Sequence, residues 1–202
     1  MVLVFHINKD VGDLMIDYKV LNIEPYINNR GFTSISTVKE GNLTLGNSSF
    51  PLEKFLHNNT YFHKDVPFHF YSNSKGDNIE LMGQRIELPS IIRADSLHII
   101  GNSSNGSFSD NILFILNNNI ILKKKINLTC LLETNSLFQN YIFKKFDYLH
   151  NMNGICYDES GTLWYEIVEF DRTLQFNEIL LPDNPFMHIF SMTYGYSKDY
   201  NN

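Results

Sequence analysis

The sequence predicts an all-β protein, an antiparallel β-sandwich of the jelly-roll kind with long irregular loops and at most one or two short helices. Two observations predict this class. Short apolar runs alternate with clusters of Asn, Ser, Gly and Pro, and no regular alternation of strand and helix patterns is present. Of the 202 residues, 43% are hydrophobic and 14% aromatic, enough to bury a core without disulfides or metals. We therefore expect one domain over residues 1–202.

The first third of the chain predicts few regular elements. Residues 2–7 and 15–23 alternate loosely enough to form two N-terminal strands, which are the less certain part of the domain. Turn-forming clusters interrupt residues 24–64, which predicts a loop-rich segment laid over a sheet, with one helical turn in 49–56. Residues 66–71 read as a strand followed by a turn at 72–78.

The remainder predicts better-marked strands and one hairpin. Apolar runs occur at residues 84–88, 96–100, 112–116, 120–126, 163–170, 174–180 and 187–194. Asn117, Asn118 and Asn119 join two of these runs, and Asn tolerates the positive φ of a tight turn. We also expect a short helix in 137–146 and a flexible tail over 195–202.

Charge and composition narrow the classes of partner. The formal net charge of −6 argues against a nucleic-acid backbone or an anionic membrane. Asn, Ser and Thr dominate the polar residues, and such a surface suits hydrogen bonding to neutral polyols. The run Lys123 to Lys125 lies in a strand pattern, where an edge-strand role is favoured over a binding patch. No basic start or long apolar run opens the chain, so we expect a cytoplasmic protein unless a signal sequence has been removed.

Cofactor and metal signals are weak. Cys130 and Cys156 match no metal-binding spacing, and free thiols are favoured over a disulfide, which remains the alternative. His57, His63 and His69 recur every six residues, a spacing that fits no common zinc motif. We expect no cofactor and no metal.

Several segments in order resemble a known module. They are VPFHF at 66–70, KGDNIELMGQRIELP at 75–89, LHIIGNSSNGSFSD at 97–110 and ILLPDNPFMHIFSMT at 179–193. Together with NNRGF at 28–32 they resemble a β-sandwich accessory module of bacterial and fungal proteins, which often accompanies glycoside hydrolases and other secreted enzymes. The resemblance spans residues 18–194 and implies a sandwich fold without a defined chemistry. Related modules usually carry an Asp-Trp pair where this chain has Leu128-Thr129-Cys130-Leu131.

The most polar loop is the first candidate for function. Seven of the eight residues from 102 to 109 are Asn, Ser or Gly. Sugars are bound by aromatic faces beside planar amides, carboxylates and imidazoles. The candidate ligand-binding residues are Asn102, Asn105, Asp110, Trp164, Tyr165, Asn184 and His188. Each also has a structural explanation: a core Trp, turn residues, or a buried His bonded to a carbonyl.

Two functions from different classes stay open. The first is a non-catalytic binding module for carbohydrate, another small polar ligand or a partner protein. The second is a stand-alone enzyme of a biosynthetic or glycan-processing pathway, with His69, His188 and Asp110 as its polar cluster. Glu166 and Glu169 lie three apart on a predicted strand, face opposite ways and make a poor glycosidase pair. A Cys/His dyad between His150 and either cysteine is a further alternative.

Overall fold

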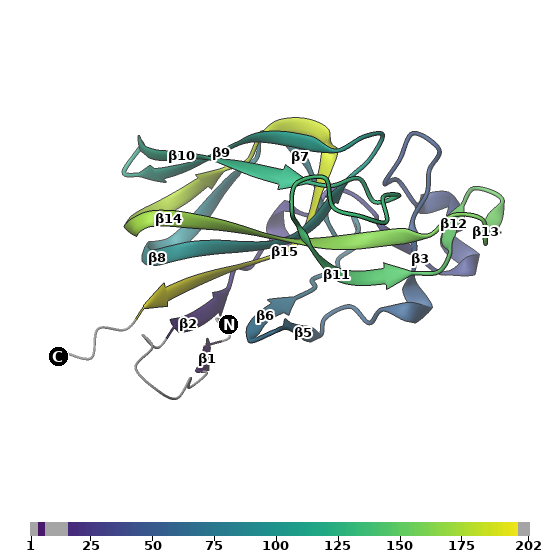
Figure 1. Cartoon of the computed structure of the whole chain (residues 1–202), viewed down its shortest axis with the longest axis horizontal. Helices are drawn as coiled ribbons and strands as arrows, with labels where there is room; N and C mark the ends of the chain where they lie inside the picture. Colours follow the sequence, from purple (N-terminus) through teal and green to yellow (C-terminus); the bar gives the residue numbers. More distant parts are fainter. Residues whose placement is uncertain (1–3, 7–15, 198–202) are drawn as a thin grey trace.

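The computed structural model describes residues 4–6 and 16–197 and shows an all-β, largely antiparallel, sandwich-like fold (Figure 1). The strands of the main sheet are β1 (Val4–His6), β2 (Ile16–Val20), β7 (Ile79–Met82), β8 (Arg85–Ser103), β9 (Phe108–Leu116), β10 (Asn119–Leu128), β11 (Tyr141–Phe146), β14 (Gly161–Leu180) and β15 (Asp183–Ser197). Their order is β1-β2-β15-β8-β14-β9-β10, with β7 paired to β15 and β11 to β14. The predicted fold class is confirmed.

Shorter elements cover one side of this sheet. They are the strand pairs β3 (Phe32–Thr33) with β4 (Phe50–Pro51), β5 (Thr60–His63) with β6 (Val66–His69) and β12 (Leu149–Asn151) with β13 (Gly154–Cys156), and the 3-10 turns η1 (Glu24–Tyr26), η2 (Ile35–Glu40) and η3 (Leu52–Lys54). η3 confirms the helical turn expected in 49–56. No helix of the described residues is long and apolar enough to cross a membrane.

Side-chain alternation along the long strands divides the core into two clusters. In β8, Leu97 and Ile99 face one cluster, which we call the sheet core, while Ile100 faces a second. The second, the cover core, joins sheet residues such as Phe190 to rings of the irregular segment such as Phe50, whose centroid lies 6.1 Å away. Successive strand residues point to opposite faces, so both faces of this part of the sheet are buried.

Four predicted strands merge into two long ones. Of the strand expected at 84–88, residues 85–88 belong with 96–100 to the single strand β8, and residues 163–170 and 174–180 belong to β14. The ladder between them shifts register between Phe176 and Glu178, opposite the stretch of β8 that holds Pro89. A bulge of this kind accommodates a residue without an N–H donor, so Pro89 does not end the strand.

The predicted helix in 137–146 is wrong, because Tyr141–Phe146 form β11 on β14. Phe143 stacks on Phe70 with centroids 5.6 Å apart, so ring packing in the cover core favours the strand. The predicted tail begins too early, because β15 continues to Ser197 by pairing with β2; residues 198–202 lie outside the described residues.

Two other features match the sequence. The β9–β10 hairpin turns through Asn117 and Asn118, whose φ values are 49° and 66°, as predicted. Cys130 and Cys156 are both free thiols. Of the strands expected at 2–7 and 15–23, Val4–His6 and Ile16–Val20 are strands; residues 1–3 and 7–15 lie outside the described residues.

Candidate functional site

A row of three polar side chains crosses the main sheet on its cover-core face. His188 of β15 pairs in register with Glu80 of β7 on one side and with Asn102 of β8 on the other. Residues directly opposite in an antiparallel ladder carry side chains on the same face. Their strand neighbours Ile79 and Met187 point into the sheet core, so the three polar groups point the other way. We call Glu80, His188 and Asn102 the polar row.

The imidazole of His188 is held by two buried asparagines. Its Nδ1 lies 3.2 Å from Asn29 Nδ2 and 3.3 Å from Asn78 Oδ1. The Asn78 amide has a fixed orientation, because its Nδ2 donates to the Asn29 carbonyl at 3.2 Å and to Asp77 Oδ1 at 3.0 Å. Asn78 Oδ1 therefore faces the imidazole.

Both asparagines offer the ring a partner. One proton of Asn29 Nδ2 goes to the Asn42 carbonyl at 3.0 Å, and the other lies within 3.2 Å of both Asn78 Oδ1 and His188 Nδ1. A protonated Nδ1 donates to Asn78 Oδ1, and an unprotonated Nδ1 accepts from Asn29 Nδ2. The distances around Nδ1 therefore fit either tautomer of the imidazole.

His188 Nε2 is buried without a hydrogen-bond partner among the described residues. Burial lowers the pKa of His188 to about 4, against a backbone hydrogen bond with Leu43 that favours the protonated ring. The ring is therefore neutral near pH 7. A buried ring nitrogen without a well-formed hydrogen bond lowers the stability of the fold.

A hollow of about 420 Å³ lies over His188. It is lined by Asn42, Leu43, Thr44, Leu45, Asn47, Glu80, Ser104, Asn105, Pro185, Phe186 and His188. This volume lies within the range of small-molecule sites. One wall is the segment 42–47 after η2, and the opposite wall comes from the β8–β9 loop and the start of β15.

Glu80 is the one lining residue besides His188 that titrates. Its side chain is half-buried, and burial raises its pKa. Its carboxylate makes no hydrogen bond or ion pair with the rest of the described chain, and no Lys or Arg lines the hollow. The hollow thus has a weakly hydrated acidic group beside a neutral imidazole.

Asn102 is the third member of the polar row. The side chain is fully buried, and both amide atoms lack a hydrogen-bond partner among the described residues. An unsatisfied buried amide lowers the free energy of unfolding, so packing alone does not account for Asn102 at this position.

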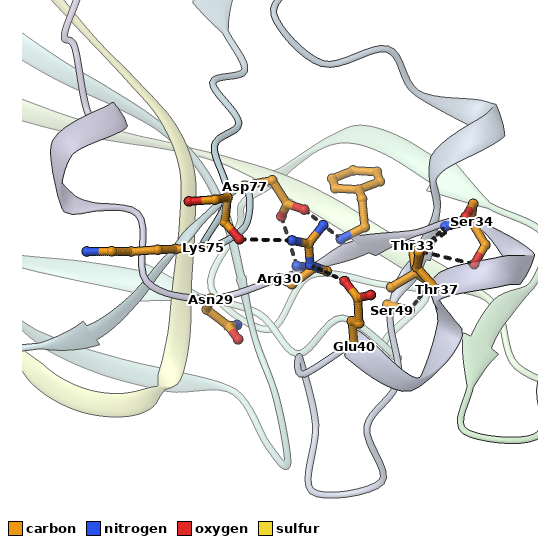
Figure 2. A network of polar contacts seen from close by, with 12 residues as sticks. Asn29, Arg30, Thr33, Ser34, Thr37, Glu40, Ser49, Lys75 and Asp77 are labelled. Atoms are coloured by element: carbon orange, nitrogen blue, oxygen red, sulfur yellow. Dashed lines mark hydrogen bonds and ion pairs between the residues drawn. The ribbon is translucent and has the colours of Figure 1, made fainter.

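Asp77 and Arg30 hold the segment that carries Asn29 (Figure 2). Asp77 Oδ1 and Oδ2 accept from the backbone N–H groups of Gly31 and Phe32 at 2.8 and 3.0 Å. Arg30 forms an ion pair with Glu40 at 3.1 Å. Because Asn29 also forms a β-bridge with Asn78, the supports of the imidazole are fixed on both sides.

A second hollow, of about 370 Å³, lies beside Arg30, His57 and Asp77. Its cationic group is already engaged, since Arg30 pairs with Glu40 and donates to the Ser74 carbonyl at 3.3 Å. Ring packing against Phe32, with centroids 4.9 Å apart, explains the position of His57. The hollow over His188 is therefore the stronger candidate.

Three of the predicted ligand-binding residues come together at this site. His188 and Asn105 line the hollow, and Asn102 lies in the polar row. Asn105 adopts φ 57° and is exposed, which places it at the rim.

The other four have local partners. Trp164 is fully buried and donates Nε1–H to the Cys130 carbonyl at 3.1 Å, and Tyr165 is buried with its hydroxyl 2.7 Å from His98 Nδ1. Neither ring has a free face, so stacking of a sugar on Trp164 or Tyr165 is excluded. Asp110 and Asn184 lie in β9 and β15, not in turns, and their side chains accept from the backbone N–H groups of Asn111 and Phe186 at 2.7 and 3.2 Å.

Sequence reasoning missed Glu80, Phe186 and the 42–47 wall. Glu80 stands between the apolar residues Ile79 and Leu81, a pattern typical of a strand with a solvated face. Nothing in the sequence shows that the irregular segment covers that face. Phe186 follows a Pro and reads as a turn residue, although it packs on Phe108 with centroids 5.5 Å apart.

The residues of the enzyme alternative have separate partners. His69 Nδ1 lies 3.0 Å from Thr60 Oγ1, whereas His188 contacts Asn29 and Asn78. Asp110 accepts a hydrogen bond from the backbone N–H of Asn111. Among the residues whose side chains the structure describes, no three His, Cys, Asp or Glu gather in metal-binding geometry. No family profile matches the chain, and the search of curated proteins finds no similar sequence.

Proposed function

We propose that this protein is a non-catalytic β-sandwich binding module for carbohydrate or a related small polyol, bound in the hollow over His188. The observation that carries the proposal is a hollow with an amide and hydroxyl rim over His188, whose Nε2 has no hydrogen-bond partner among the described residues. A ligand hydroxyl, which both donates and accepts, can supply the missing hydrogen bond to the imidazole in either tautomer.

The rim supplies the remaining recognition chemistry. Asn42, Asn47 and Asn105 present planar groups that both donate and accept, which match the paired lone pairs and protons of sugar hydroxyls. Phe186 is half-buried, with one face stacked on Phe108 at an interplanar angle of 15°. It supplies the apolar surface for sugar C–H groups, a role that the sequence suggested for Trp164 and Tyr165.

Two further features support binding over catalysis. His188 has a pKa of about 4 because it is buried, so it is a poor proton carrier near pH 7. Neither His69 nor Asp110 contacts it. The resemblance to accessory modules of glycoside hydrolases agrees with this proposal and stays a prediction.

A pair of variants tests the proposal. Asn105→Ala removes a rim amide, and we expect it to weaken carbohydrate binding about tenfold, as expected for a lost hydrogen bond in a polar site. Asn118→Ala is the matched control, because Asn118 is also exposed with positive φ, 66° against 57°, but lies in the β9–β10 turn. Binding is measured first on a glycan array and then by calorimetry on the retained glycan.

Both variants should lose the same small amount of stability, because each places Ala in the left-handed region. Equal binding by both variants, or retention of no glycan by the unmodified protein, would contradict the proposal.

A further inference from the structure

The rim of the hollow carries one of the two Asn-Gly pairs in the sequence, Asn105-Gly106, and the other pair is Asn153-Gly154. In an Asn-Gly pair, the backbone nitrogen of the glycine reaches the side-chain carbonyl carbon of the asparagine easily, because no Cβ atom hinders its approach. Both asparagines are exposed, so water reaches both side chains. Sequence and exposure alone therefore predict equal reactivity for the two pairs.

The two pairs differ in the hydrogen bonding of the glycine nitrogen. Gly154 begins β13 and lies opposite Asn151, and the residue that closes such a two-residue hairpin donates its N–H across the turn. Gly106 lies between β8 and β9, which do not pair with each other. Its N–H makes no hydrogen bond with the described residues. The fold therefore leaves the nitrogen of Gly106 free and holds that of Gly154.

The surroundings of Asn105 leave its side chain free to react. Its Nδ2 lies 3.3 Å from Ser104 Oγ, near the limit of a hydrogen bond. The carbonyl of Gly106 accepts from Ser103 Oγ at 2.7 Å, which fixes the far side of the glycine and leaves its N–H unbonded. The one contact that the side chain must give up is thus weak.

We propose that Asn105 is a site of spontaneous deamidation in the folded protein. The nitrogen of Gly106 loses its proton and attacks Cγ of Asn105, so a C–N bond forms, the bond from Cγ to Nδ2 breaks, and ammonia leaves with the proton. One water molecule then opens the resulting succinimide ring. The product is a carboxylate at residue 105, either on an aspartate side chain or in an isoaspartate linkage, and water is the only co-reactant.

The reaction changes the hollow over His188. The rim loses the amide of Asn105 and gains a negative charge, in a space that the carboxylate of Glu80 also lines. A neutral polyol loses a hydrogen-bond donor, and like charges at the rim repel each other. This consequence rests on the proposed binding function, whereas the reaction itself does not.

Peptide mapping by tandem mass spectrometry tests the reaction. The protein is incubated at mildly alkaline pH, folded in buffer or unfolded in urea, and the conversion of Asn105 and Asn153 is followed over time. In the folded protein we expect Asn105 to react at least about tenfold faster than Asn153, which is the ratio that one additional broken hydrogen bond produces. In urea the two rates should become equal, because neither glycine nitrogen is then held.

The mapping can overturn the inference without any variant. Equal rates in the folded protein, or faster conversion of Asn153, would show that the free nitrogen of Gly106 does not promote the reaction. A ratio that persists in urea would show that the fold is not its cause. Asn105→Gln, which lengthens the side chain and keeps the amide, should remove the signal at this position and leave the conversion of Asn153 unchanged.

A glycan array tests the consequence separately. Asn105→Asp reproduces the main charge change and should weaken glycan retention, as should incubation of the unmodified protein. Asn153→Asp is the matched control, because it makes the same change at an exposed position away from the hollow, and it should leave retention intact. Equal retention by the two variants overturns the effect on binding. Retention of no glycan by fresh protein overturns the proposed function, while the mass spectra still decide the reaction.

Discussion

At the scale of single residues, the polar row departs from the rules of a stable core. Asn102 is fully buried, and both of its amide atoms lack a hydrogen-bond partner among the described residues. His188 Nε2 is also buried without such a partner. Asn140, by contrast, is a buried amide whose Nδ2 donates to the Asn127 carbonyl at 2.9 Å and whose Oδ1 accepts from Thr129 Oγ1 at 2.7 Å. The two asparagines therefore have opposite effects on stability.

This contrast gives a stability prediction. Asn102→Leu removes an unsatisfied amide of similar size, so we expect the free energy of unfolding to rise by about 1–3 kcal/mol. Asn140→Leu is the matched control. This variant should lower the free energy of unfolding, because the buried groups that bond the Asn140 amide lose their hydrogen-bond partner. Urea unfolding measures both, and a loss for Asn102→Leu as large as that for Asn140→Leu would show that this amide is satisfied in solution.

The individual candidate residues were only partly predictable. His188, Asn102 and Asn105 stand out in the sequence because polar residues of these types bind ligands. Trp164 and Tyr165 stand out for the same reason, and burial removes them. The exposure of a strand residue depends on which other segments pack over the strand. The residues next to it in the sequence do not specify those segments.

At the scale of elements, the turn at 73–76 fixes the floor of the site. Gly76 has φ 146°, and a Cβ atom there would lie 1.9 Å from the Asn29 carbonyl oxygen. Asp77 and Asn78 follow this turn directly and hold the backbone and side chain of the segment that contacts His188. Close approach of the two backbones therefore positions the imidazole.

Substitution of Gly76 should be severe. Gly76→Ala combines an unfavourable φ with a backbone clash, and we expect the free energy of unfolding to fall by about 3–4 kcal/mol. Gly83→Ala is the control, since Gly83 also has positive φ, 70°, but its Cβ would meet its nearest atom at 3.8 Å. That variant should lose only about 1 kcal/mol. Comparable urea midpoints for the two variants would argue against the close contact at Asn29.

Most strands were predictable as elements, and their lengths were not. Apolar runs mark parts of β8, β14 and β15, yet Pro89 and the polar residues near 171–173 suggested breaks that the structure spans. Bulges and cross-strand pairing continue a strand through such residues, and both depend on the partner strand. The failed helix at 137–146 has the same cause, because pairing with β14 and ring contacts outweigh local propensity.

At the scale of the whole molecule, buried histidines couple folding to pH. Burial lowers the pKa of His57, His98 and His188 to about 4 in each case. Burial raises the pKa of Asp77 to about 6 against the hydrogen bonds that it accepts. These histidines are therefore protonated less readily in the folded protein than in the unfolded chain.

The sign of the pH dependence follows from these four groups. As pH falls from about 6.5 to about 4, the three histidines are protonated in the unfolded chain but stay largely neutral in the folded protein. Asp77 has the opposite effect, because it is protonated at a higher pH in the folded protein than in the unfolded chain. Near pH 5 the unfolded state holds about two more protons, so we expect the free energy of unfolding to fall by roughly 2–3 kcal/mol per pH unit.

Urea unfolding between neutral and mildly acidic pH measures this slope. His57→Phe, which keeps a ring beside Phe32, should reduce the slope by about one proton, or roughly 1.4 kcal/mol per pH unit. Stability that rises on acidification would mean that these histidines are protonated in the folded protein.

The sequence by itself determined the fold class, the β9–β10 hairpin and the polar character of the loop at 102–109, because alternation, turn propensity and composition are local properties. Only the tertiary structure decided the site. The row of Glu80, His188 and Asn102 joins three strands, and the wall at 42–47 and the support from Asn29 and Asn78 come from segments far away in the chain. These residues come together only through the strand register and the packing of the irregular segment. Both are set by contacts between residues that are far apart in the sequence.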